Sequence, residues 1–214
     1  RVLFRSFRSL KQRNSALKLH DLAQTKAYDP LLVEHGEKLN FLRKNLIDSV
    51  KEIYDSLVKN LEAENKRAEI FLNLDIYLKP GFDDHKGLLW DLNNTNSIDL
   101  KRKVTTKGPH KSDVIFESKG SLIKDIFSRG EQKLLSILWS LSQNIYLGRA
   151  FNLNPILLLD DLSSELDSEM LECFLPTFKY IENRFIFSNI VDLFDSKIDV
   201  SDKTFKKFHV EQLR

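Results

Sequence analysis

The sequence predicts an α/β fold joined to a helical arm. Within residues 31–68, apolar residues recur at three-, four- and seven-residue intervals with charged residues between them, which is typical of a long amphipathic helix. Beyond residue 154, two aliphatic runs flank a segment with helical spacing, and the order strand, helix, strand implies a parallel sheet. We therefore expect a helical arm in residues 1–70 and an α/β domain in residues 71–214.

The composition is that of an ordered protein without strong net charge. Of 214 residues, 42% are hydrophobic and 30% charged, which excludes a disordered tail. Lys and Arg number 33 against 31 Asp and Glu, so any nucleic-acid signal must come from local clusters. The single Cys173 excludes a disulfide framework and fits a reducing compartment. Since no apolar run reaches the length of a membrane span, we expect a cytoplasmic protein without membrane contact.

Two helices are expected in the arm. Basic residues alternate with Leu3, Phe7 and Leu10 at helical spacing, which predicts a first helix over residues 2–22. The Asp29-Pro30 pair is expected to break the chain, because proline cannot donate an intrahelical hydrogen bond. A second helix is therefore predicted from Leu31 to about Ala68.

The elements of the second part follow from alternation, turn residues and apolar runs. We expect strands at residues 71–78 and 114–116, a short helix at 86–93, and a polar connection at 93–97. Further along, we expect a helix at residues 131–147, a fully buried strand at 155–159, a helix at 168–180 and a strand at 184–188.

An acidic pair follows the buried strand. Four aliphatic residues precede Asp160 and Asp161, and ligands of α/β sheets bind outside the carboxyl ends of strands. Asp160 can hold Mg²⁺ there, and Asp161 is placed to orient or deprotonate an attacking water. Taken alone, Asp161 is equally well interpreted as the cap of a turn.

A second motif precedes the helix expected from residue 131. The start of a helix offers free N–H groups and a favourable dipole to a phosphate, Ser128 adds a hydroxyl, and Gly130 allows close approach. Taken alone, this motif is better interpreted as an ordinary N-cap serine.

Four segments in register resemble the RecF family of ABC-type ATPases. They are Leu-Lys-Gln-Arg-Asn at 10–14, Gly-Pro-His-Lys-Ser-Asp at 108–113, Ser-Arg-Gly-Glu-Gln-Lys at 128–133, and the run at 157–167 that ends in Ser-Ser-Glu-Leu-Asp. The resemblance implies the carboxy-terminal part of an ABC-type ATPase head with a short coiled-coil arm. It also implies a role for each motif residue.

In these implied roles, the signature contacts the γ-phosphate of an ATP held by the partner subunit, Asp160 holds Mg²⁺, and Asp161 is catalytic. The implied signature consists of Ser128, Arg129, Gly130 and Glu131. The implied D-loop at the dimer interface consists of Ser164, Glu165, Leu166 and Asp167. Glu131 stands where the broader signature has glutamine, so it places a carboxylate near a phosphate.

The phosphate loop Gly-x-x-x-x-Gly-Lys-[Ser/Thr] does not occur in the sequence. We therefore expect the chain to be a piece of a longer polypeptide, with ATP hydrolysis confined to the full-length dimer and the piece alone inactive.

Two basic clusters are candidates for DNA contact, because DNA affinity comes largely from Lys and Arg placed along one surface. The first lies at three- and four-residue steps in the first helix and consists of Arg1, Arg5, Arg8 and Lys11. The second precedes the Gly-Pro-His motif and consists of Lys101, Arg102, Lys103 and Lys107. A solvated helix face is the alternative for the first cluster, and His110 is interpreted as a structural loop histidine.

The resemblance implies an ATP-dependent homodimer on duplex or gapped DNA that works with RecR and RecO in repair, replication restart and SOS induction. One alternative is a non-enzymatic module that binds a partner through the arm. Another is an SMC-like chromosome-associated head, although such a head would carry a much longer coiled coil.

Overall fold

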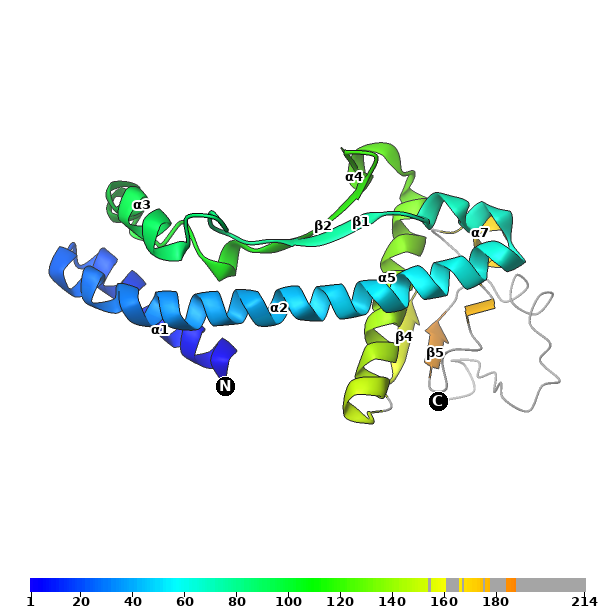
Figure 1. The fold of residues 1–214 in the computed structure, drawn as a ribbon, viewed down its shortest axis with the longest axis horizontal. Helices are drawn as coiled ribbons and strands as arrows, with labels where there is room; N and C mark the ends of the chain where they lie inside the picture. Colours follow the sequence, from blue (N-terminus) through cyan, green and yellow to red (C-terminus); the bar gives the residue numbers. More distant parts are fainter. Residues whose placement is uncertain (154, 161–165, 167, 175, 178–183, 188–214) are drawn as a thin grey trace, which may run out of the picture. The chain divides into compact units, whose positions relative to one another are not determined.

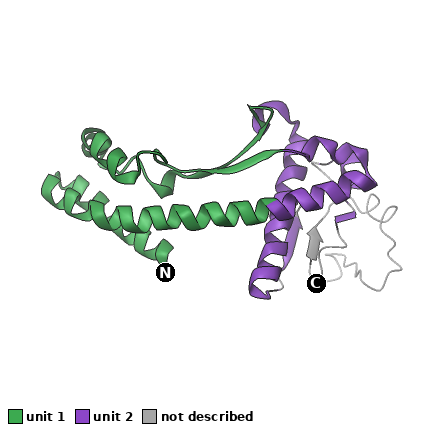
Figure 2. Cartoon of the chain, viewed as in Figure 1, with its two compact units in different colours: residues 1–51, 74–122 green, residues 52–73, 123–214 purple. Residues whose placement is uncertain are grey.

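The computed structural model describes residues 1–153, 155–160, 166, 168–174, 176–177 and 184–187 (Figure 1). The chain divides into two compact units (Figure 2). Unit 1 contains Arg1–Lys51 and Leu74–Leu122, and unit 2 contains Glu52–Asn73 and Ile123–Arg214. These units do not follow the expected boundary near residue 70, because residues 74–122 pack with the amino-terminal helices, and the division into arm and head stays a prediction.

The two helices of the arm differ from the prediction at their ends. Helix α1 (Val2–Lys18) stops four residues early, and His20 follows it with a φ of 56°. Helix α2 (Leu22–Glu64) then begins where the Asp21 carboxylate accepts the Gln24 N–H at 2.9 Å. A side-chain acceptor of this kind satisfies one of the free N–H groups at a helix start.

The predicted break at Asp29-Pro30 is wrong, because α2 runs through Pro30. Proline in a helix interior costs about 3 kcal/mol. Tertiary contacts on both sides of it outweigh that cost. Asp29 is buried in an ion pair with Arg13, and the Leu32 side chain is only 1% exposed.

The predicted polar connection at residues 93–97 is also wrong, since helix α3 (Leu88–Arg102) continues through it. The Thr95 hydroxyl donates to the Asp91 carbonyl at 2.9 Å, and the Asn94 amide donates to the Trp90 carbonyl at 2.7 Å. These side chains therefore bond to the backbone of the same helix. Leu92, Thr95 and Asp99 are buried, so this face of α3 packs against the rest of unit 1.

Unit 1 contains a small antiparallel sheet in the order β1-β2-β3 (Figure 1). Strand β1 (Asp75–Lys79) pairs with β2 (Asp113–Ser118), and β2 pairs with β3 (Ser121–Leu122). The strand expected at 114–116 is confirmed. The strand expected at 71–78 begins only at Asp75, because the 3₁₀ helix η1 (Lys66–Phe71) ends at Phe71 and a turn follows it, in which Asn73 has a φ of 54°.

Beyond β1, the chain approaches itself closely before reaching β2. The Gly108 N–H donates to the Gly81 carbonyl at 2.9 Å, and the short 3₁₀ helix η2 (Pro109–Lys111) follows. A Cβ atom at Gly81 would lie 2.1 Å from the Gly108 carbonyl oxygen, so only glycine fits there. Leu32 of α2 packs with Phe82, Leu88 and Leu92 in a buried hydrophobic cluster of this unit.

Unit 2 contains helices α4 (Ile123–Ile126), α5 (Arg129–Phe151) and α7 (Ser168–Phe174) with strands β4 (Leu157–Asp160) and β5 (Arg184–Phe187). Strands β4 and β5 are parallel, which confirms the predicted strand, helix, strand order.

In the same unit, the hydroxyl of the buried Tyr54 of α2 donates a hydrogen bond to the Phe71 carbonyl at 3.0 Å. Burial, and after it the charge of Asp55, raises the pKa of Tyr54.

Strand β4 is not fully buried, which corrects the expectation for this run. Leu157 and Leu159 are 9% and 5% exposed, whereas Leu158 is 63% exposed and the preceding Ile156 is 59% exposed. Successive side chains of a strand point to opposite faces, so only one face of β4 is covered by the described residues.

None of the helices in the part of the chain that the structure describes is long and apolar enough to cross a membrane.

Candidate functional site

The signature segment forms the start of α5. Ser128 is the N-cap, and its hydroxyl oxygen accepts the Glu131 N–H at 3.3 Å. The Glu131 carboxylate returns to accept the Ser128 N–H at 2.6 Å. Ser128 and Glu131 therefore form a capping box, in which two N–H groups at the helix start are satisfied reciprocally.

The residues around Ser128 hold its backbone in place. The Gln132 side chain donates to the Phe127 carbonyl at 2.8 Å, while the Phe127 N–H donates to the Ile123 carbonyl at 2.9 Å. The Phe127 ring also packs edge-to-face on Phe71, with centroids 5.6 Å apart. Ser128 itself stays exposed, so the turn presents its side chain on a fixed backbone.

This geometry is compatible with both interpretations of the motif. In the capping box the Ser128 oxygen only accepts a hydrogen bond, so its O–H remains able to donate to a phosphate oxygen. The N–H groups of Arg129 and Gly130, in the first turn, have no intrahelical acceptor. Glu131 opposes an anion here, because its carboxylate already occupies the Ser128 N–H.

The second part of the predicted nucleotide site is only partly within the described residues. Asp160 is the last residue of β4 and is in register with Phe187 of β5, at the carboxyl end of the parallel pair. This is the backbone position that the sequence predicts for a magnesium ligand. Of the expected D-loop only Leu166 is described, and it is buried. Asp161, Ser164, Glu165 and Asp167 lie outside the described residues.

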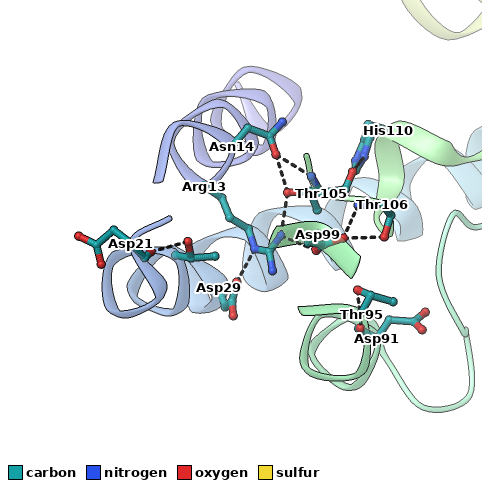
Figure 3. Close-up of polar contacts among 11 residues, drawn as sticks. Arg13, Asn14, Asp21, Asp29, Asp91, Thr95, Asp99, Thr105, Thr106 and His110 are labelled. Atoms are coloured by element: carbon teal, nitrogen blue, oxygen red, sulfur yellow. Dashed lines mark hydrogen bonds and ion pairs between the residues drawn. The ribbon is translucent and has the colours of Figure 1, made fainter. Parts of the chain in front are cut away.

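A buried polar network in unit 1 joins two of the motifs (Figure 3). The fully buried Arg13 of α1 donates from Nε to Asp29 of α2 and from a terminal nitrogen to Asp99 of α3, each at 2.7 Å. It also donates to the Thr105 hydroxyl at 2.8 Å. One guanidinium therefore connects three helices and the loop that follows α3.

Further bonds fix that loop. The Asn14 side-chain oxygen accepts the N–H and the hydroxyl of Thr105 at 2.8 and 2.7 Å. Asp99 Oδ1 accepts the N–H and the hydroxyl of Thr106 at 2.9 and 2.6 Å. The backbone of the loop is therefore held by side chains from α1 and α3, and we call the Asn14–Thr105 contact the clamp.

His110 closes the network from the other side. Its Nε2 lies 3.0 Å from the Thr105 carbonyl oxygen, which makes this nitrogen the donor. Partial burial lowers the pKa of His110, and the positive charges of Lys111 and Arg13 lower it further. The hydrogen bond to Thr105 and the charge of Asp99 raise this pKa, but the net direction is downward. The interpretation of His110 as a structural loop histidine agrees with this position.

Sequence reasoning missed the network although its residues lie in or beside two quoted motifs. Arg13 and Asn14 end the first motif, and Thr105 and Thr106 precede the second. The signal that could have found it is a basic residue on the apolar face of an amphipathic helix, since a buried arginine requires acidic partners. Neither Asp29 nor Asp99 stood out from the surrounding polar residues.

The basic candidates are distributed over unit 1. Arg1, Arg5, Arg8 and Lys11 of α1 are exposed, as are Lys101, Arg102 and Lys103 at the end of α3, whereas Lys107 is half-buried. The clamp holds Thr105, which lies between Lys103 and Lys107, against α1.

Comparison with known proteins finds relatives of this chain among RecF proteins. No protein-family model matches it. The RecF protein of Coxiella burnetii is 30% identical over 184 residues, which cover 86% of this chain and 50% of that protein. The RecF protein of Acinetobacter baumannii is 34% identical over 165 residues, which cover 75% and 43%. Over most of its own length, the chain is therefore similar to part of the RecF proteins. It spans about half the length of these RecF relatives, which are described as DNA replication and repair proteins.

Solved RecF structures share the fold. The recombination mediator protein RecF with ATP, in the RecFOR pathway, matches with a TM-score of 0.67 at 21% identity, over 89% of this chain and 53% of that chain. A second RecF structure, with ATPrS, gives 0.66 at 22% identity. The predicted α/β fold with a helical arm is therefore confirmed, and it matches part of the RecF structures.

Proposed function

We propose that this chain is the signature-bearing part of a RecF-like ATPase that dimerises with ATP on duplex DNA near gaps. In this proposal, the dimer supports loading of a strand-exchange protein in repair and replication restart, together with RecR-like and RecO-like partners. The phosphate loop is supplied by polypeptide outside these 214 residues.

The observation that carries the proposal is the exposed Ser128 at the start of α5. The rigid turn presents the serine hydroxyl together with the free N–H groups of Arg129 and Gly130. Helix starts of this kind bind phosphate through N–H groups and the helix dipole. Similarity to RecF supports the choice of ATP as the phosphate compound, because the solved RecF structures that share this fold hold ATP or ATPrS.

The remaining roles follow from position along the chain. Asp160 ends a strand of a parallel pair, where a carboxylate is suited to a magnesium ion that neutralises phosphate charge. We assign water activation to Asp161 and the dimer-crossing contacts to residues 164–167. In this scheme Ser128 and Gly130 orient the phosphate of the partner subunit's nucleotide, and hydrolysis allows the dimer to separate.

One pair of substitutions separates phosphate binding from helix capping at Ser128. Asp is as good an N-cap as Ser, whereas Ala costs about 1 kcal/mol. Ser128→Asp therefore retains the cap while it places a carboxylate where the phosphate would lie. We expect the full-length gene product with Ser128→Asp to keep its thermal stability and to lose ATP-dependent dimerisation.

The measurement is light scattering coupled to size exclusion, with and without ATP and Mg²⁺, for the parent, Ser128→Asp and Ser128→Ala. Ser128→Ala should be less stable yet keep part of the ATP response. ATP-dependent dimerisation that survives Ser128→Asp unchanged contradicts the phosphate role. A parent protein that never responds to ATP contradicts the ATPase assignment as a whole.

A further inference from the structure

The clamp joins two segments of like charge that are distant in the sequence. Asn14 and Thr105 are 91 positions apart, and their hydrogen bonds are 2.7 and 2.8 Å long. Residues 1–20 contain no Asp or Glu, and residues 100–112 contain none either. Basic side chains that surround this contact therefore have no acidic neighbour in their own segments.

Only some of the basic residues lie on the clamp side of α1. Positions three or four residues apart share a helix face, so Lys11 and Lys18 lie on the face of Asn14. At about 100° per residue, Arg5 lies on the opposite side of α1 from Asn14, and Arg1 and Arg8 lie more than about 100° away from it. The basic row predicted from the sequence is thus split between two faces.

The same reasoning divides the second cluster. Lys103 and Lys107 stand two residues before and two residues after Thr105, in the loop that the clamp fixes. Lys101 follows the buried Asp99 by two positions in α3, which places it on the far side of that helix, whereas Arg102 follows Asp99 by three positions and lies near its face. Four lysines therefore surround the clamp, and we call Lys11, Lys18, Lys103 and Lys107 the clamp rim.

The loop that carries half of this rim is held firmly. Lys103 has a left-handed backbone with φ 57°, and its N–H bonds to carbonyls of the last turn of α3. The Val104 N–H donates to the Asp99 carbonyl at 3.2 Å, and Thr105 and Thr106 are held as described. Cations fixed on a rigid backbone lose less entropy on binding than cations on a mobile loop.

The buried charges beneath the rim do not cancel its field. Asp29 and Asp99 are each paired with Arg13, which leaves one net negative charge below four exposed or half-exposed lysines. The exposed Asp21, three residues after Lys18, adds one more negative charge, and the four lysines still leave the rim positive. Lysine acts on phosphate as a point charge without a fixed geometry, which suits contacts to a backbone of repeating phosphates.

We propose that the clamp rim is the surface of unit 1 that contacts the phosphate backbone of duplex DNA, and that the Arg1, Arg5 and Arg8 row is not. This inference rests on the proposed function, which supplies DNA as the partner. Lys11 and Lys18 are seven residues apart, or about 10 Å along the helix, which is close to three base-pair steps of about 3.4 Å.

Two matched double substitutions test the surface. Lys11→Ala with Lys18→Ala removes two rim charges, and Arg5→Ala with Arg8→Ala removes two exposed charges from the same helix. Binding of the full-length gene product to a fluorescent blunt duplex, with ATP present, is measured across a range of salt concentrations. We expect the slope of log affinity against log salt to fall by about two for the rim pair and to stay unchanged for the arginine pair.

Asn14→Leu provides a second test because it keeps all four lysines and removes the clamp acceptor. We expect it to reduce the salt slope while circular dichroism still reports a folded helical protein. An arginine pair that lowers the slope as much as the rim pair overturns the inference, as does a rim pair without effect. If the parent protein does not bind duplex DNA, the proposed function itself is overturned. Polyglutamate serves as a probe for an acidic protein, and binding of polyglutamate in place of duplex DNA overturns the inference and assigns the rim to such a partner.

Discussion

Arg13 is the residue on which the interior of unit 1 depends most. It is fully buried and carries its charge between Asp29 and Asp99, both of which are almost inaccessible to solvent. A buried ion pair adds little net stability compared with apolar residues, but removal of one partner leaves an uncompensated buried charge. Removal of Arg13 should therefore destabilise the fold, even if the ion pairs add little net stability.

Arg13→Leu should lower the free energy of unfolding by about 3–5 kcal/mol, since two carboxylates would remain buried without a cation. Arg5→Leu is the control, because Arg5 is exposed on the same helix and such substitutions change stability by less than about 0.5 kcal/mol. Urea unfolding of the chain, followed by circular dichroism, measures both. A loss below about 1 kcal/mol for Arg13→Leu would mean that the network is not formed in solution.

His110 connects the same network to pH. Its pKa in the folded protein is lowered, mainly by burial, so the unfolded chain binds a proton that the folded chain resists. Stability contributed by neutral His110 is therefore complete above the unfolded pKa of about 6.5 and is lost as the pH falls towards the folded pKa. We expect the midpoint of urea unfolding to decrease below about pH 6.5.

His110→Gln keeps a side-chain donor for the Thr105 carbonyl but cannot take up a proton. The variant should therefore show a flatter dependence of unfolding midpoint on pH between about 5 and 7 than the parent protein. His20 provides the control, because this histidine lies outside the network. If His20→Gln flattens the profile as much as His110→Gln, the pH dependence has another origin.

At the scale of the element, α2 shows how tertiary contacts override a local signal. Proline within a helix lowers the free energy of unfolding by about 3 kcal/mol. Its restricted backbone also reduces the entropy of the unfolded chain, which offsets about 1 kcal/mol of that loss. Pro30→Ala should therefore stabilise the chain by about 2 kcal/mol in urea unfolding. Pro80→Ala is the control, because Pro80 directly follows β1 outside any helix, and there the loss of a rigid residue should be neutral or destabilising. Unchanged stability with Pro30→Ala would indicate that α2 is bent or broken at this point in solution.

Elements with clear periodicity were predictable, and errors arose where long-range contacts decide. The spacing of aliphatic residues located α5, β4 and β5 and their parallel order. Nothing near Pro30 indicates that Asp29 would pair with Arg13, and nothing in residues 93–97 indicates that Thr95 would be buried. An unbroken run of aliphatic residues also does not indicate whether one or both faces of a strand are covered. In β4 one face is left uncovered by the described residues, and Leu158 is exposed on it.

For the candidate site, the sequence located the residues but could not locate the surfaces. The start of α5 and its serine cap were predictable from the order Ser, Arg, Gly, Glu. The split of the basic row between two faces of α1 was not, because it depends on which face Thr105 contacts. Spacing relates residues on one helix, whereas the position of a distant loop is set by the three-dimensional fold.

At the scale of the whole molecule, the chain presents apolar surface beside its parallel strands. Leu158 is 63% exposed and Ile156 is 59% exposed, on the face of β4 that the described residues leave uncovered. Exposed apolar patches promote association. The chain also spans about half the length of its RecF relatives, which agrees with a face that further polypeptide covers.

Leu158→Lys should therefore act in opposite directions in two contexts. In the 214-residue chain it removes exposed apolar area, so light scattering should report less self-association, with Ser140→Lys on α5 as a control for the added charge alone. In the full-length gene product, a covered Leu158 would place the lysine in an apolar interface and lower the free energy of unfolding by at least about 2 kcal/mol. If the substitution leaves the stability of the full-length product unchanged, Leu158 faces water there too, and the exposed face of β4 requires a different partner.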